Sequence, residues 1–97
     1  MRAVIVARVA RLVARAAAEN WPIRSDHCFL RIAYDDAVGA QWGRVHARPA
    51  WRNLPFDRLA AALAALERID RDGLAALVPL NAASLAMRSR ARYKPGA

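Results

Sequence analysis

Hydrophobic positions at the start of the chain recur at the spacing of an α-helix. Over residues 2–19, a rotation of about 100° per residue separates an arginine stripe from an aliphatic face. The stripe holds Arg8, Arg11 and Arg15, and the opposite face holds Ile5, Val9, Leu12, Val13 and Ala16. We expect this amphipathic helix to end near Asn20, because Pro22 disfavours helical backbone at Trp21.

The segment after Pro22 predicts a second helix. Ser25 or Asp26 can cap its start and Gly39 can end it. A helix places Phe29, Ile32, Ala33, Ala37 and Ala40 on one face. The alternative is an α+β fold with a small hairpin at about 27–47. Residues 30–33 do not alternate with the two-residue period of a half-buried strand, which favours the helix.

Residues 41–53 show no steady period, and we interpret them as an ordered loop. The next helix is the clearest in the chain. Asn53 is expected to cap it, with Pro55 in its first turn. Its core stripe is predicted to be Phe56, Leu59, Leu63, Leu66 and Ile69.

The last third of the chain contains two predicted breaks. Asp72 and Gly73 form the first, a helical turn follows over 74–78, and Pro79 forms the second. Asn81 then caps a last helix that runs to about Arg92. The prediction is an all-α, single-domain bundle of four to five short helices over residues 1–92, with a loose tail over 93–97.

Composition supports this fold and adds a strong positive charge. Alanine, the commonest residue, favours helices over strands. The net charge is +8, and all of the 16 basic residues except Lys94 are arginine. We expect the guanidinium groups to face water, where nucleic acid, an acidic protein or an anionic membrane surface could meet them. A genome rich in arginine and alanine codons would produce the same count.

Two arginine-rich stretches are candidate contacts for nucleic-acid phosphates or a protein partner. In the first, tryptophans alternate with arginines, a pattern that can stack bases or grip a protein. The second follows at the C-terminus. The candidate residues are Arg44, Arg48, Trp51, Arg52, Arg88, Arg90, Arg92 and Lys94.

Reactive side chains are densest in residues 21–36, WPIRSDHCFLRIAYDD. On a helix, His27, Arg31 and Asp35 line up, so an ion pair between Arg31 and Asp35 is expected. This segment forms either a site or a structural salt-bridge cluster. The further candidate residues here and nearby are Trp21, Arg24, Arg31, Asp35 and Trp42.

An enzyme centred on residues 24–36 is a third hypothesis, with Asp26, His27 and Cys28 as its candidate catalytic residues. Neighbouring helical residues point about 100° apart, so His27 is badly placed to serve Cys28, and His46 is the better base. The chain has neither the paired ligand spacings of zinc sites nor a glycine-rich phosphate loop. No metal and no cofactor are predicted.

Two resemblances bear on function. Residues 73–90, GLAALVPLNAASLAMRSR, resemble the two-helix core of helix-turn-helix DNA-binding proteins, with Ala75 as the small packing residue and Asn81 as the cap. The whole chain resembles a family of short uncharacterised bacterial and fungal proteins with a WPIRxDHCFxRI core, some of which are labelled acetyltransferases. That second resemblance implies that residues 21–35, 42–52 and 80–88 form one connected surface or core.

The leading hypothesis is a non-enzymatic binding module that contacts nucleic-acid phosphates through an arginine-rich surface. The alternative is a protein-interaction or regulatory module that binds an acidic partner or a second copy of itself. A cytoplasmic location is expected, because Cys28 has no internal disulfide partner and no secretory pattern is present. No apolar run approaches the roughly 20 residues of a membrane span. The sequence leaves the oligomeric state open.

Overall fold

Residues 2–92 form six helices. The computed structural model describes residues 1–92, with side chains described as far as Ser89. The helices are α1 (Arg2–Glu19), α2 (Asp26–Val38), α3 (Trp42–Val45), α4 (Ala50–Asn53), α5 (Phe56–Asp72) and α6 (Leu74–Arg92). Residues 1–92 contain no strand, so the all-α prediction is confirmed and the hairpin at 27–47 is wrong. The predicted loose tail, residues 93–97, lies outside the described residues.

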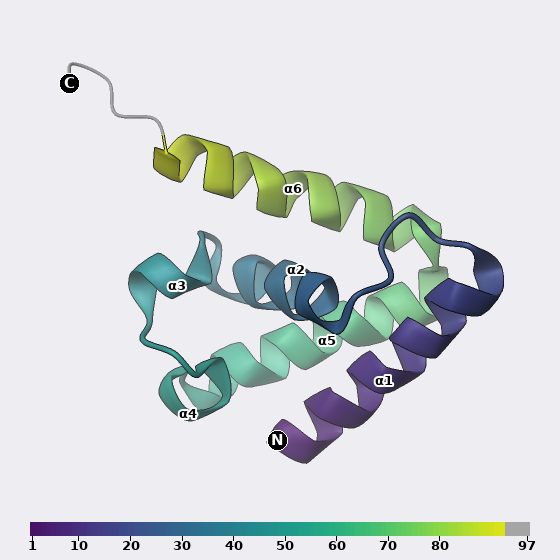
Figure 1. The fold of residues 1–97 in the computed structure, drawn as a ribbon. Helices are drawn as coiled ribbons and strands as arrows, with labels where there is room; N and C mark the ends of the chain where they lie inside the picture. The colour runs from purple at the N-terminus through teal and green to yellow at the C-terminus, as the bar shows by residue number, and fades with distance from the viewer. Residues whose placement is uncertain (93–97) are drawn as a thin grey trace.

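Helix α2 occupies the middle of the arrangement. It packs against α1, α3, α5 and α6, and Figure 1 shows α6 on one side of it with α1 and α5 on the other. The short helices α3 and α4 follow α2 and lie at the far end of the bundle from the α5–α6 connection (Figure 1). Segments far apart in the sequence therefore meet around α2.

One apolar core holds the four long helices together. Its fully buried side chains include Leu12, Phe29, Ile32, Leu66 and Leu77, which come from α1, α2, α5 and α6. Burying a side chain of this size stabilises the fold by about 1.5–3 kcal/mol. No helix among residues 1–92 is both long enough and apolar enough to cross a membrane.

The ends of α1 and α2 follow the sequence prediction. Asn20 ends α1 in the left-handed conformation at φ 58°, and Gly39 ends α2 at φ 77°. The Ser25 side chain caps α2 by accepting a hydrogen bond from the His27 backbone N–H at 3.2 Å. Ser25 rather than Asp26 is therefore the capping residue.

The predicted loop over 41–53 instead contains α3 and α4, joined by a segment with a cis Arg48–Pro49 peptide bond. Each of these one-turn helices buries one anchor, Trp42 in α3 and Ala50 in α4. Such helices are too short to show a period. Asn53 belongs to α4, where its side chain donates to the Pro49 carbonyl at 3.0 Å. Pro55 precedes α5, so the predicted Asn53 cap is wrong.

Helix α5 buries most of its predicted stripe but not its first member. Leu59, Leu66 and Ile69 are buried and Leu63 is partly buried, whereas Phe56 is 70% exposed. Phe56 occupies the first position of α5. The spacing of apolar residues correctly predicted which face of α5 is buried. It did not predict where along the helix that burial begins.

Helix α6 runs without a break from Leu74 to Arg92, with Pro79 inside it. The break predicted at Pro79 and the cap predicted at Asn81 are both wrong. Proline lacks the N–H that would bind the Ala75 carbonyl, but Ala75 and Pro79 are both exposed, so water can satisfy that carbonyl. The turn that the helix-turn-helix resemblance requires is therefore absent from the described chain.

Candidate functional site

The arginine stripe of α1 forms ion pairs with an aspartate of α5. Asp70 on α5, only 10% exposed, lies 2.7 Å from Arg8 and 2.9 Å from Arg11, and Arg15 also binds its carboxylate and carbonyl. Burial raises the pKa of Asp70, but the hydrogen bonds from Arg11 and Arg8 outweigh it and leave the pKa below its ordinary value. This stripe therefore joins α1 to α5. The side chains of Arg8 and Arg15 are only about 30% exposed, contrary to the expectation that they face water, whereas that of Arg11 is 69% exposed while it pairs with Asp70.

A second buried carboxylate, Asp35 on α2, organises the other side of the bundle. Asp35 is fully buried and accepts four hydrogen bonds. Arg88 of α6 donates through Nε at 2.9 Å and Nη2 at 3.2 Å, Ser84 donates through its hydroxyl at 2.6 Å, and Trp42 donates through its backbone N–H at 3.0 Å. Asp35 therefore joins α2, α3 and α6 at one point.

Arg31 does not pair with Asp35, so the expected ion pair is wrong. Its guanidinium donates to Ser84 and to the side-chain carbonyl of Asn81, both at 2.8 Å. Arg31 and Asp35 share a face of α2, as predicted, but this face packs on α6, which supplies closer partners for both. Ser84 binds Arg31 and Asp35 together and links the two residues indirectly.

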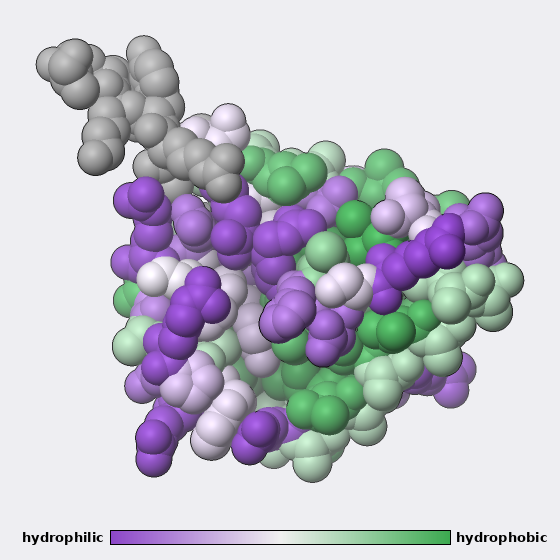
Figure 2. Space-filling model, in the orientation of Figure 1, coloured by the Kyte–Doolittle hydropathy of each residue, from purple (hydrophilic) through white to green (hydrophobic). Residues whose placement is uncertain are grey.

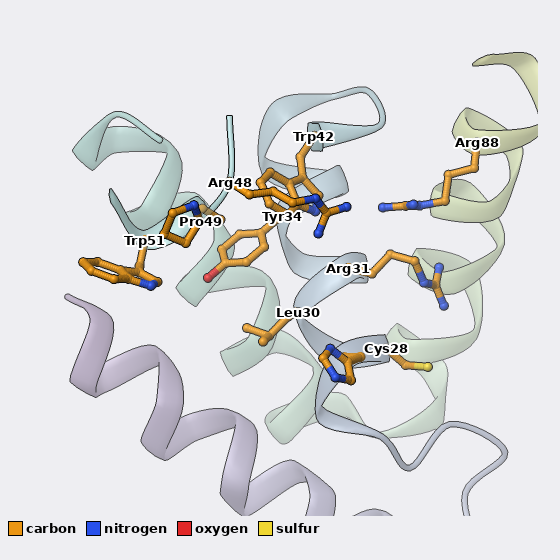
Figure 3. Close-up of a pocket in the computed structure, with 11 residues that line it drawn as sticks. Cys28, Leu30, Arg31, Tyr34, Trp42, Arg48, Pro49, Trp51 and Arg88 are labelled. Atoms are coloured by element: carbon orange, nitrogen blue, oxygen red, sulfur yellow. The ribbon is translucent and has the colours of Figure 1, made fainter. Parts of the chain in front are cut away.

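A hollow of about 470 Å³ opens beside this network, between α2, α6 and the α3–α4 segment (Figure 3). We call it the arginine–tryptophan hollow. Its lining includes three arginines and three large aromatic rings, with no aspartate or glutamate among the described residues. The lining residues are His27, Cys28, Leu30, Arg31, Tyr34, Trp42, Arg48, Pro49, Ala50, Trp51 and Arg88. The lining therefore combines positive charge with flat apolar surface.

The arginines of the hollow are held by neighbouring groups. The guanidinium carbon of Arg48 lies 5.0 Å from the centre of the Trp42 ring, and Figure 3 shows the ends of Arg48 and Arg88 turned toward one another. Tyr34 packs edge-on against Trp42 with ring centres 5.4 Å apart, and burial raises the pKa of its phenol. Trp51 is 41% exposed, with Arg2 of α1 4.3 Å above its ring. Trp51 is therefore the most exposed aromatic ring of the hollow, with one face covered by Arg2.

The hollow gathers some of the predicted site residues and omits others. It unites Arg31, Trp42, Arg48, Trp51 and Arg88, each from a different helix or connection. Figure 2 shows hydrophilic residues gathered over the α3–α4 end of the same face. Arg44 and Arg52 are exposed on α3 and α4 beside the hollow but do not line it. The side chains of Arg90 and Arg92, together with Lys94, lie outside the described part of the chain.

Two further candidates serve the fold. Trp21 is buried, with the Arg15 guanidinium 4.9 Å from its ring centre. Arg24 donates to the Trp21 carbonyl at 2.8 Å and to the Asn20 side chain. These contacts fix the connection between α1 and α2 and leave Trp21 and Arg24 outside the hollow.

The candidate catalytic residues do not assemble into a reactive pair. The Asp26 carboxylate accepts a hydrogen bond from the His27 backbone N–H at 2.8 Å, in the first turn of α2. His27 and Cys28 both line the hollow, but no hydrogen bond joins an imidazole to the thiol within the described residues. In residues 1–92, no group of three or more histidine, cysteine, aspartate or glutamate side chains is placed to hold a metal ion.

Sequence reasoning missed Asn81, Ser84 and Tyr34. A signal for the first two was present, because Asn81, Ser84 and Arg88 follow one another at spacings of three and four residues in an otherwise apolar stretch. The expected break at Pro79 hid this polar stripe. Tyr34 carried no signal of its own, since one aromatic residue on a helix face is ordinary core.

Comparison with known proteins found no match to a protein family, a curated protein or a solved structure. The function is therefore argued from the site alone.

Proposed function

We propose that this protein is a binding module for single-stranded nucleic acid, which it holds at the arginine–tryptophan hollow. One observation carries the proposal. Arg31, Arg48 and Arg88 line one hollow beside the single carboxylate of Asp35, which Arg88 binds directly and Arg31 reaches only through Ser84, while Arg48 lies over the Trp42 ring. Three positive charges against one negative charge leave an excess that an anionic ligand would balance.

The shape and aromatic content favour a single strand over a duplex. A concave hollow whose cations come from α2, the α3–α4 segment and α6 does not present the protruding helix or ribbon that enters a major groove. Stacking requires a base whose face is free, as in single strands, and Trp51 is a 41% exposed ring that Arg2 covers on one face. Arg44 and Arg52 next to the hollow would contact phosphates further along the strand.

Binding to an acidic protein or to a second copy of the chain is the competing function. It uses the same positive charge but does not require an open stacking surface. A small enzyme has weaker support, because no imidazole among the described residues is hydrogen-bonded to the Cys28 thiol. We place the binding activity in the cytoplasm, where reducing conditions keep Cys28 a thiol.

The test is a tryptophan fluorescence titration with single-stranded DNA and RNA of about ten nucleotides, the matching duplexes and polyglutamate. We expect single strands to bind more tightly than duplexes, with an affinity that falls as salt rises. Polyglutamate binding as tightly as a single strand would favour the protein-interaction function. Absence of binding at low salt, or binding that salt does not weaken, would reject the nucleic-acid proposal.

Matched variants distinguish binding at the hollow from attraction to the overall positive charge of the protein. Arg48→Gln removes one charge from the hollow, and Arg68→Gln removes one from the exposed surface of α5. The slope of log affinity against log salt reports the number of phosphate contacts. We expect Arg48→Gln to reduce this slope by about one and Arg68→Gln to change it little. Trp51→Ala should cost about 1–3 kcal/mol of binding free energy, whereas Phe56→Ala removes an exposed ring outside the hollow and should cost little.

A further inference from the structure

The cations of the hollow are concentrated at one place. Arg88 binds Asp35 directly, and Arg31 is two hydrogen bonds from the same carboxylate through Ser84. Arg48 lies over the ring of Trp42, whose backbone N–H also binds Asp35. Cations that follow the backbone of a strand are spread along a groove, one near each phosphate. Here they converge on a single hollow.

The charge balance of this cluster matches a particular kind of phosphate. Of the three guanidinium groups that line the hollow, only that of Arg88 is paired with a carboxylate, that of Asp35, and those of Arg31 and Arg48 form no ion pair with an acid in the described chain, so the cluster carries an excess of about two positive charges. A phosphate inside a strand is a diester with one negative charge. A terminal phosphate is a monoester with a charge of about −1.5 to −2 at neutral pH and three acceptor oxygens. The cluster is thus better matched to a monoester than to a diester.

Two of the guanidinium groups are oriented before a ligand arrives. Arg88 is held by both Asp35 oxygens, and Arg31 is held by Asn81 and Ser84. Each guanidinium has more N–H donors than these bonds use, and both residues line the hollow. A preformed arrangement of this kind loses less side-chain entropy on binding. The cluster is therefore already arranged to donate several hydrogen bonds to one compact anion.

The aromatic surface beside the cluster is suited to one base. Trp42 is buried beneath Arg48 and the edge of Tyr34, whereas Trp51 is 41% exposed at the rim, with Arg2 over one face of its ring. A hollow of about 470 Å³ is at the small end of the range for ligand sites, which is the size class of one nucleotide.

Resting on the proposed function, we infer that the hollow binds a terminal phosphate monoester with its attached nucleotide. The phosphate would lie among Arg31, Arg48 and Arg88, and the base against Trp51. The same chemistry occurs at the phosphorylated end of a strand and in a free nucleoside monophosphate. The two sources are distinguished by experiment.

The experiment compares four probes by tryptophan fluorescence and by calorimetry at one salt concentration. They are a short single strand with a 5′-phosphate, the same strand with a 5′-hydroxyl, adenosine monophosphate and adenosine. We expect the 5′-phosphate to tighten strand binding by about tenfold, adenosine monophosphate to compete with the strand, and adenosine not to bind. A strand with a 3′-phosphate shows whether either end suffices.

Variants assign the preference to the cluster. Arg48→Gln should remove most of the difference between the phosphorylated and hydroxyl strands, whereas Arg68→Gln should leave it unchanged. Because Arg88 supports the fold through Asp35, Arg48 is the primary variant, and Arg31→Gln provides an independent second one. Circular dichroism confirms that each variant is folded before binding is compared.

The outcomes separate this inference from the proposed function. Equal affinity for the phosphorylated and hydroxyl strands would overturn the terminal-phosphate inference and leave single-strand binding intact. If adenosine monophosphate binds as tightly as the phosphorylated strand, the inference stands and the strand-binding function fails, because the remaining nucleotides contribute nothing. If no probe binds, both proposals are rejected.

Discussion

Arg88 on α6 holds the buried carboxylate of Asp35 on α2 with two parallel hydrogen bonds, Nε to Oδ2 at 2.9 Å and Nη2 to Oδ1 at 3.2 Å. Asp35 is fully buried, and the Arg88 side chain remains 20% exposed at the edge of the hollow. The Asp35 carboxylate therefore has a structural role, whereas the Arg88 guanidinium can also reach a ligand in the hollow. Substitutions at different members of this network should therefore affect stability and binding to different degrees.

Removing Arg88 should destabilise the protein severely. Arg88→Met leaves a buried charge without its main partner, and breaking a buried pair in this way costs about 3–5 kcal/mol. The double variant Asp35→Asn/Arg88→Met should lose less than the sum of the two single variants, since the unpaired charge is then absent. Urea unfolding of the four proteins measures this coupling. Strictly additive losses would show that the two side chains do not interact.

Asp70 should make the protein sensitive to acid. Because Arg11 and Arg8 hold the pKa of Asp70 below its ordinary value, the folded state resists protonation and the unfolded state does not. The stability that Asp70 contributes is present above about pH 4 and is lost as pH falls through the lowered folded-state pKa. Asp70→Asn should remove this part of the acid dependence. Urea unfolding at a series of pH values checks it, and parallel stability curves for the two proteins would contradict it.

Pro79→Ala should stabilise the protein by about 1–2 kcal/mol. The substitution restores the N–H that can bind the Ala75 carbonyl inside α6, and this gain exceeds the entropy advantage that proline gives by restricting the unfolded chain. Thermal unfolding with circular dichroism measures the change. If residues 74–92 formed two helices with a turn at Pro79, the substitution would bring no gain.

Two substitutions test which residues of α5 belong to the core. Leu66 is fully buried and Phe56 is 70% exposed, although both lie on the stripe that the sequence predicts as core. Leu66→Ala should cost about 2–5 kcal/mol through the cavity that it leaves. Phe56→Ala should change stability by less than about 0.5 kcal/mol. A large loss from Phe56→Ala would place that ring in the core.

The sequence by itself determined the helices whose signals are local. The period of apolar residues in α1, α2 and α5 reflects one buried face on a regular helix, and Asn20, Ser25 and Gly39 end or begin helices through their own backbone and side-chain bonds. The arginines and tryptophans of the 41–53 segment were also visible as candidates. Each of these features depends on residues within a few positions of one another.

Only the tertiary structure decided which charged side chains form ion pairs within the protein. Arg8, Arg11 and Arg15 meet Asp70 across more than fifty residues of sequence, and Asp35 meets Ser84 and Arg88 across a similar separation. A guanidinium takes whichever acceptor the packing of helices brings within reach, and no local pattern encodes that choice. The continuity of α6 through Pro79 was decided in the same way, because the cost of the missing hydrogen bond depends on whether the freed carbonyl faces water or the core.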